Sequence, residues 1–168
     1  MIQDQDQGSS PAQKSNKKAS KTEMRRAARK FAVQAVYSWQ MAGQPINEIE
    51  AMFRTDNDMS QTDVSLFSEI LRGVSSNSTE LDAAYGPFLD RALDDLDPIE
   101  RAVLRIGSFE LIHRLSVPYR VVINESVDLA KIFGATESHK YVNGILDKLA
   151  QRVRMVEIRA RHEANKKK

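Results

Sequence analysis

Residues 97–115, DPIERAVLRIGSFELIHRL, are the stretch that decides the fold of this chain. Asp97 followed by Pro98 is the residue pair that the N-cap and the first turn of an α-helix prefer. Apolar side chains then occur on most sides of the predicted helix, at Ile99, Ala102, Val103, Leu104, Ile106, Phe109, Leu111 and Ile112. A helix with so little polar surface must be covered by other elements, so we expect it at the centre of the fold.

Amphipathic segments on both sides of this helix predict further helices. The first begins behind a capping box, Ser20 with Glu23 three residues later, and ends by Gly43. Apolar side chains at helical spacing predict the others over residues 46–53, 64–74, 81–88, 121–133 and 141–149. No segment alternates between apolar and polar residues as a half-buried strand does. We therefore predict an all-α fold of about seven helices.

Length and composition limit the possible classes of protein. The chain has 168 residues, of which 41% are hydrophobic, enough for one domain or for two small subdomains that share a core. No apolar run is long enough to cross a membrane, and the N-terminal residues lack the pattern of a signal peptide. The absence of cysteine excludes disulfides and thiolate metal sites and is typical of a reducing compartment, so we expect a cytoplasmic protein.

The net charge of +2 is distributed unevenly along the chain. Residues 1–30 and 150–168 each carry a net charge of +5, whereas residues 31–149 carry −8. Basic ends around an acidic body favour two surfaces for two kinds of partner, although solubilising tails would have the same composition. We expect a disordered basic tail over residues 1–21, a helical domain over 22–156, and a fraying helix end and basic C-terminal tail over 157–168.

Four cations gather at the start of the first predicted helix: Arg25, Arg26, Arg29 and Lys30. The apolar residues of the same helix, from Ala28 to Trp39, recur at helical spacing and form a separate stripe that is suited to packing. The positive end of a helix dipole repels cations, so a sequence selected for stability alone would place Asp or Glu there. The cluster therefore favours a polyanionic partner over a solvated face, and no helix-turn-helix pattern points to duplex DNA.

No group of residues has the spacing of a catalytic or metal site. The three histidines lie on separate segments, and none has a partner at the spacing of helical metal ligands. Ser138, His139 and Lys140 are adjacent, but adjacent residues of a helix do not face one another. Lys140 and Tyr141 pair a cation with a ring that could stack on a base, although the spacing of Tyr141 with Ile145 favours the core. We expect a binding protein rather than an enzyme, without a cofactor or a bound metal.

Three segments resemble the NusB family of bacterial transcription antitermination factors: RRAARKFAVQAVYSWQ (25–40), DPIERAVLRIGSFEL (97–111) and VPYRVVINESVDLAKIFGATESHKYVNGILDKLA (117–150). The likeness extends from about residue 24 to residue 150. It implies an all-helical fold in which two subdomains pack around the central helix. It also implies binding to the single-stranded boxA element of nascent ribosomal RNA, together with a small-subunit ribosomal protein called NusE. In this family the complex joins RNA polymerase and other Nus factors and prevents early termination of rRNA transcription.

The resemblance also implies roles for individual residues. The residues expected to contact RNA are Arg25, Arg26, Arg29, Lys30, Lys140 and Tyr141. Glu100 stands where the family presents an acidic contact to its ribosomal-protein partner. Ala27 replaces one arginine of the family's usual helix start, so the individual phosphate contacts differ from that pattern.

Two alternative functions remain to be weighed against that of an RNA-binding antitermination factor. A NusB-like domain also begins an rRNA cytosine methyltransferase, but here we find no catalytic cysteine and expect no methyl-donor domain within 168 residues. A non-enzymatic helical scaffold that binds only proteins is the remaining alternative. Binding of a boxA-like RNA would separate the two.

Overall fold

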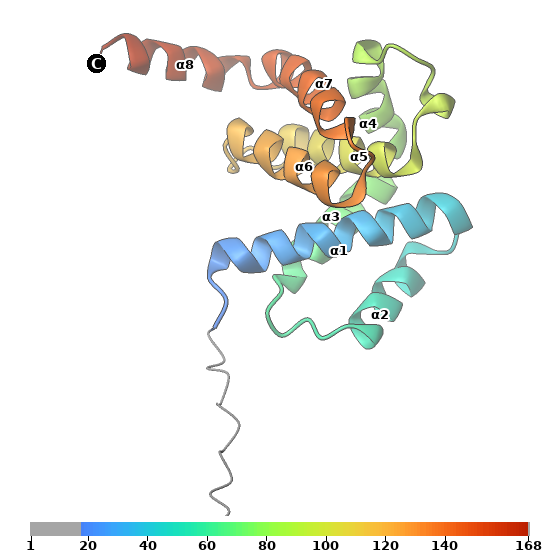
Figure 1. Ribbon diagram of the computed structural model, residues 1–168. Helices are drawn as coiled ribbons and strands as arrows, with labels where there is room; N and C mark the ends of the chain where they lie inside the picture. The colour runs from blue at the N-terminus through green and yellow to red at the C-terminus, as the bar shows by residue number, and fades with distance from the viewer. Residues whose placement is uncertain (1–17, 168) are drawn as a thin grey trace, which may run out of the picture.

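The computed structural model describes residues 18–167, which form eight α-helices and two short 3₁₀ helices and contain no strand (Figure 1). In chain order the elements are α1 (Lys21–Ala42), α2 (Ile46–Asp56), α3 (Val64–Ser76), α4 (Ser78–Tyr85), η1 (Gly86–Phe88), η2 (Leu93–Asp95), α5 (Pro98–His113), α6 (Tyr119–Phe133), α7 (Ser138–Val153) and α8 (Met155–Lys166). The predicted all-α class is confirmed, and the predicted number of helices is close. None of the described helices combines the length and apolar content needed to cross a membrane. The tail predicted over residues 1–21 lies, up to residue 17, outside the described residues.

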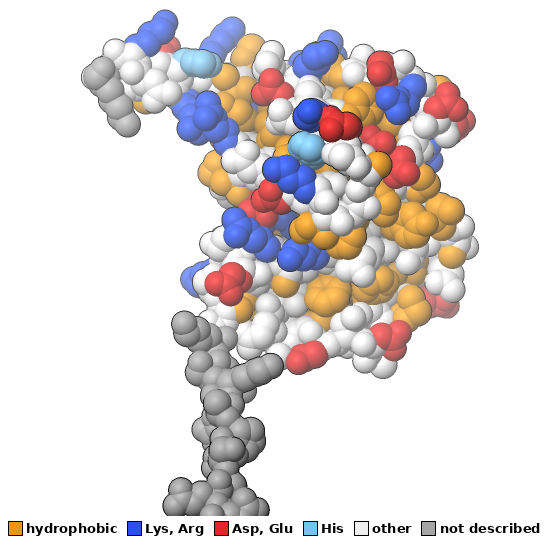
Figure 2. Space-filling view, viewed as in Figure 1, with side chains coloured by type: hydrophobic (Ala, Val, Ile, Leu, Met, Phe, Trp, Pro, Cys, Tyr) orange, Lys and Arg blue, Asp and Glu red, His pale blue; other side chains and the backbone are white. Residues whose placement is uncertain are grey.

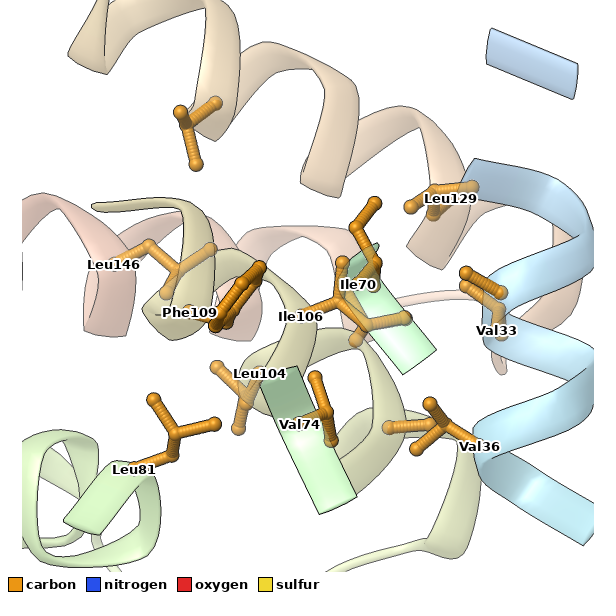
Figure 3. Packing of buried hydrophobic residues seen from close by; sticks show 14 of the residues in the cluster. Val33, Val36, Ile70, Val74, Leu81, Leu104, Ile106, Phe109, Leu129 and Leu146 are labelled. Atoms are coloured by element: carbon orange, nitrogen blue, oxygen red, sulfur yellow. The ribbon is translucent and has the colours of Figure 1, made fainter. Parts of the chain in front are cut away.

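Helix α5 runs through the middle of the molecule, as the sequence predicts, and contacts α1, α3, α4, α6 and α7. Every residue from Ala102 to Leu111 is buried. Figure 3 shows Leu104, Ile106 and Phe109 surrounded by apolar side chains of these five helices. The carboxylate of Asp97 caps the first turn by accepting a hydrogen bond of 2.8 Å from a backbone N–H. Contacts on all sides explain why apolar residues cover most of this helix.

The other helices form two groups around α5. Helix α1 packs against α2 and α3 in the lower part of Figure 1, whereas α4, α6 and α7 contact α5 in the upper part. Helix α1 also contacts α6, and the two groups share one hydrophobic core. The predicted ends of α1 are confirmed, because Ser20 Oγ accepts a hydrogen bond of 3.1 Å from the Glu23 N–H and Gly43 has a left-handed φ of 65°. The arrangement is that of two subdomains around a central helix.

The C-terminal end differs from the predicted fraying end and tail. Helix α7 ends at Val153, and a separate helix, α8, continues from Met155 to Lys166. Arg154 leaves the helical conformation between them, with a φ of −122°. Its buried guanidinium donates hydrogen bonds to carbonyl oxygens at the end of α5, including that of Leu111 at 2.7 Å. Neither glycine nor proline marks this break, so the local sequence carries no signal for it.

Gly73 on α3 lies against the ring of Phe109, and a Cβ added there would stand 2.1 Å from Cε2 of that ring. Gly73→Ala should therefore lower the free energy of unfolding by about 1–3 kcal/mol, the usual cost of overpacking, despite the better helix propensity of alanine. Gly144→Ala on α7 is the matched control, because nothing lies within 4 Å of its added Cβ. It should stabilise the protein by up to about 1 kcal/mol. Urea unfolding measures both variants, and equal effects would contradict this packing.

Candidate nucleic-acid interface

The start of α1 lies beside α6 and the loop between α5 and α6, where the surface is hollowed by a depression of about 540 Å³. Residues from all three elements line it: Thr22, Arg25, Arg26, Arg29, Arg114, Ser116, Val117, Pro118, Val121 and Glu125. A neighbouring depression shares Arg26 and Glu125 and adds the charged residues Lys30, Lys131 and Asp128. We call the two depressions together the basic cleft. Figure 2 shows Lys and Arg side chains, in blue, gathered between α1 and α6.

Three of the predicted RNA contacts are accessible at the basic cleft. Arg25 and Lys30 are exposed, and neither forms an ion pair with any residue that the structure describes. The side chain of Arg26 is 53% exposed, and its Nε donates a hydrogen bond to Glu125 Oε1 at 3.0 Å. This hydrogen bond, together with the charge of Glu125, raises the pKa of Arg26. Arg25 and Lys30 are therefore unpaired within the described chain, and Arg26 is paired with one carboxylate, that of Glu125.

Arg29 does not belong to this accessible set, and the prediction that it points away from the packing side of its helix is wrong. Its side chain is only 4% exposed, and its Nε and Nη2 donate hydrogen bonds to the Glu110 carboxylate at 3.0 and 2.9 Å. The same carboxylate accepts a hydrogen bond from Arg114 Nη1 at 3.0 Å. Position 29 directly follows Ala28 and precedes Ala32 by one turn, and both alanines are fully buried. Arg29 therefore ties α1 to α5 instead of offering a free charge.

Lys140 and Tyr141 lie in the first turn of α7, on a different helix from the arginines. Lys140 is exposed and pairs with Glu137 at 2.9 Å. The Tyr141 hydroxyl donates a hydrogen bond to Asp90 at 2.7 Å, and the guanidinium of Arg91 lies 4.5 Å from the centre of the tyrosine ring. Partial burial and the Asp90 hydrogen bond raise the pKa of Tyr141. The ring thus packs against the connection between α4 and α5, and a cation already lies over it.

Glu100 lies in the first turn of α5, away from the arginines of α1 in the chain. The residue is 8% exposed, and within residues 18–167 no side chain forms a hydrogen bond or ion pair with its carboxylate. Burial, and then the nearby charge of Asp97, raise the pKa of Glu100. An ionised carboxylate with little solvent and no partner is costly. A cation from another molecule would therefore find an acceptor that is not engaged elsewhere.

Sequence reasoning missed four charged residues of the basic cleft: Arg114, Glu125, Asp128 and Lys131. They belong to the α5–α6 loop and to α6, and the packing of α6 against α1 brings them to the arginine cluster. Single charged residues in amphipathic helices are ordinary surface features, so the spacing of these four carried no signal. Across residues 18–167, no group of three or more His, Asp or Glu side chains could hold a metal ion.

Comparison with known proteins decides the family. A model of the NusB family matches residues 26–151. The chain belongs to the NusB family. The transcription antitermination protein NusB of Marinomonas sp. (strain MWYL1) is 58% identical over 163 residues, which cover 96% of this chain and 93% of the relative. The protein of the same name from Pseudomonas savastanoi pv. phaseolicola (strain 1448A / Race 6) is 56% identical over 140 residues, covering 83% and 85%.

Solved structures of the NusB family share the fold. T. maritima NusB matches with a TM-score of 0.67 and 26% identity, over 75% of this chain and 89% of that chain. A crystal structure of the antitermination factors NusB and NusE in complex with dsRNA matches with a TM-score of 0.69 and 25% identity. That match covers 76% of this chain and 96% of the other. The all-helical NusB fold expected from the three segments is thus confirmed.

Glu110→Gln removes the negative charge that binds Arg29 and Arg114 while it preserves the size of the side chain. Because Arg29 is buried, the loss of its charged partner should lower the free energy of unfolding by about 3–5 kcal/mol. Arg25→Gln removes an exposed, unpaired cation from the same helix and is the control, with an expected change below about 0.5 kcal/mol. Denaturant unfolding measures both variants. A Glu110→Gln protein as stable as the Arg25→Gln protein would show that the buried pair is not needed for stability.

Proposed function

We propose that this chain is a transcription antitermination factor that binds single-stranded boxA-type RNA of nascent rRNA transcripts together with the ribosomal protein NusE. The complex joins RNA polymerase with other Nus factors and keeps rRNA transcription processive. The observation that carries the proposal is the accessible charge of the basic cleft, where Arg25 and Lys30 have no ion pair in the described chain. Membership of the NusB family supports the same function, because its relatives are named as transcription antitermination proteins.

The basic cleft suits the backbone of a nucleic acid. Phosphate oxygens can bind Arg25 and Lys30 without breaking an ion pair. Arg26 can exchange the carboxylate of Glu125 for a phosphate, which replaces one anion by another at a partly exposed site. The positive end of the α1 dipole adds to the attraction for phosphate. Contacts to phosphates fix the position of the RNA but do not distinguish one base from another, so other groups have to select the bases.

Lys140 and Tyr141 are our candidates for contacts beyond the cleft. Lys140 is exposed and can reach a phosphate by leaving its surface pair with Glu137. Tyr141 can stack on a base if Arg91, which now lies over the ring, moves aside. A guanidinium and a base both bind the π-face of an aromatic ring, so one can replace the other.

The start of α5 supplies a second surface of opposite charge. Glu100 has no side-chain partner in residues 18–167, and Asp94, Asp95 and Asp97 are exposed nearby in the sequence. Ribosomal proteins are generally basic, so charge complementarity favours NusE as the occupant of this surface. The cations on α1 and the acidic residues before and within α5 thus provide separate contacts for RNA and protein.

Replacing Arg25, Arg26 and Lys30 together by Ala should weaken RNA binding and flatten its salt dependence. Each phosphate that no longer pairs with a cation should lower the slope of log K against log salt by about 0.7, so the three substitutions together should lower it by up to about 2. Gel shifts with a boxA-like RNA at several salt concentrations, with and without NusE, measure the effect. Arg54→Ala on α2, which removes an exposed cation, is the control. Unchanged affinity and slope in the triple variant would show that RNA binds outside the basic cleft, whereas a wild type that binds no RNA would favour the protein-only scaffold.

Glu100→Lys should impair binding to NusE, because the substitution places a cation opposite a basic partner. Binding of RNA by the isolated protein should stay the same, since Glu100 is not among the residues of the basic cleft. Calorimetry with each partner separately measures the two affinities, and Glu100→Gln should give an intermediate loss for NusE. If Glu100→Lys binds NusE as well as the wild type does, this residue is outside the interface. Equal losses for both partners would indicate misfolding.

A further inference from the structure

Helix α8 extends from the body of the protein as an arm with no buried residue (Figure 1). Arg159, Arg161 and Lys166 are exposed on it, and none forms an ion pair with another described residue. Tertiary packing of an apolar face supplies most of the stability of an ordinary protein helix. On α8 such packing is confined to the base, where Ile158 lies partly buried against the core, while Met155 and Val156 are exposed. From Arg159 onward the described arm is exposed, and its cations have no partner among the described residues.

Stabilisation of the helix itself accounts for only one of the three cations of α8. Lys166 lies in the last turn, where a cation stabilises the negative end of the helix dipole. Arg159 and Arg161 lie earlier in the helix, before the last turn in which this effect is felt. Glu163 follows Arg159 by four residues, yet the two form no ion pair in the structure of residues 18–167. Three cations and two carboxylates give α8 a net charge of +1, and Arg159 and Arg161 are not held in an ion pair within the described chain.

The base of α8 is fixed to the wall of the basic cleft. Arg154, which is 4% exposed, donates hydrogen bonds from Nη1 to the Val117 carbonyl oxygen at 2.9 Å and to Glu157 at 2.6 Å. Glu157 in turn accepts a hydrogen bond of 2.9 Å from the backbone N–H of Tyr119. Val117 also lines the basic cleft. The loop between α5 and α6 therefore contacts both the cleft and the base of the arm.

We propose that α8 is a second RNA-binding element, which contacts the phosphate backbone of RNA that continues beyond the stretch held in the basic cleft. The inference rests on the proposed function, since it needs an RNA in the cleft. Figure 2 shows blue side chains on the arm and again, on the same side of the molecule, around the basic cleft and the start of α1. An RNA strand that leaves the cleft over the α5–α6 loop reaches Arg159 and Arg161 on the arm. The contact is electrostatic, so it lengthens the site without selecting bases.

The test compares two single-stranded RNAs that share a boxA-like segment. One has about 12 nucleotides, within the range that a single binding groove holds, and the other continues to about 30. Arg159→Gln/Arg161→Gln should weaken binding of the long RNA by roughly fivefold for each arginine–phosphate pair removed at about 0.1 M salt, and lower its salt slope by up to about 1.4. Binding of the short RNA should stay the same. Arg159→Lys/Arg161→Lys, which keeps the charge of the arm, is the matched control and should bind both RNAs as the wild type does.

The outcomes separate this inference from the proposed function. If the glutamine variant binds both RNAs like the wild type, or loses affinity equally for both, α8 is not a second RNA-binding element. In that case the proposed function would still stand, provided that the short RNA binds and that its binding depends on Arg25 and Lys30. If the wild type binds neither RNA, both proposals fail. If the glutamine variant binds RNA as the wild type does but no longer binds an acidic protein, the arm is a binding site for that protein and not for RNA. Circular dichroism confirms that the helix content of each variant is preserved.

Discussion

Glu110 lies almost entirely inside the protein, where its carboxylate binds the guanidinium groups of Arg29 and Arg114. A buried carboxylate without a charged partner would be strongly unfavourable or would take up a proton. One arginine comes from α1, and the other directly follows the last turn of α5. The first helix, the central helix and the loop that follows it are therefore held in one relative position by a single buried anion.

The same anion shapes the charge of the basic cleft. Arg29 and Arg114 both line the cleft, and Glu110 behind them neutralises one of their two charges. Arg114 also pairs with Glu69, with Nε 3.3 Å from Oε1, so two carboxylates balance the charges of the two arginines and fix both side chains in place. The exposed side chains of Arg25 and Lys30 stand beside this wall of the cleft, and we propose that they contact phosphate directly.

Features that depend on neighbours in the sequence could be predicted, whereas features that depend on a distant partner could not. The caps at Ser20 and Asp97 and the apolar surface of α5 are local, and the structure contains all of them. Arg29 stands beside Arg25 and Arg26 in the chain, so its charge indicated an exposed position. Its burial is tolerable only because Glu110, 81 residues later, supplies an anion. The buried neighbours of Arg29 on α1 were the better signal, since they place it on the packing side of the helix.

Arg154 shows the same principle at the other end of the chain. Its guanidinium donates hydrogen bonds to the carbonyl oxygens of Glu110 and Arg114, at the end of α5. That end is the negative pole of the helix dipole, and its last carbonyls have no partner within the helix. Arg29, Arg114 and Arg154 thus converge on one negative region at the end of the central helix. The basic cleft and the base of the α8 arm are both built on this region. A substitution of one of these three arginines should therefore disturb the structure of the cleft and of the arm. Loss of one exposed cation should weaken RNA binding and leave the fold unchanged.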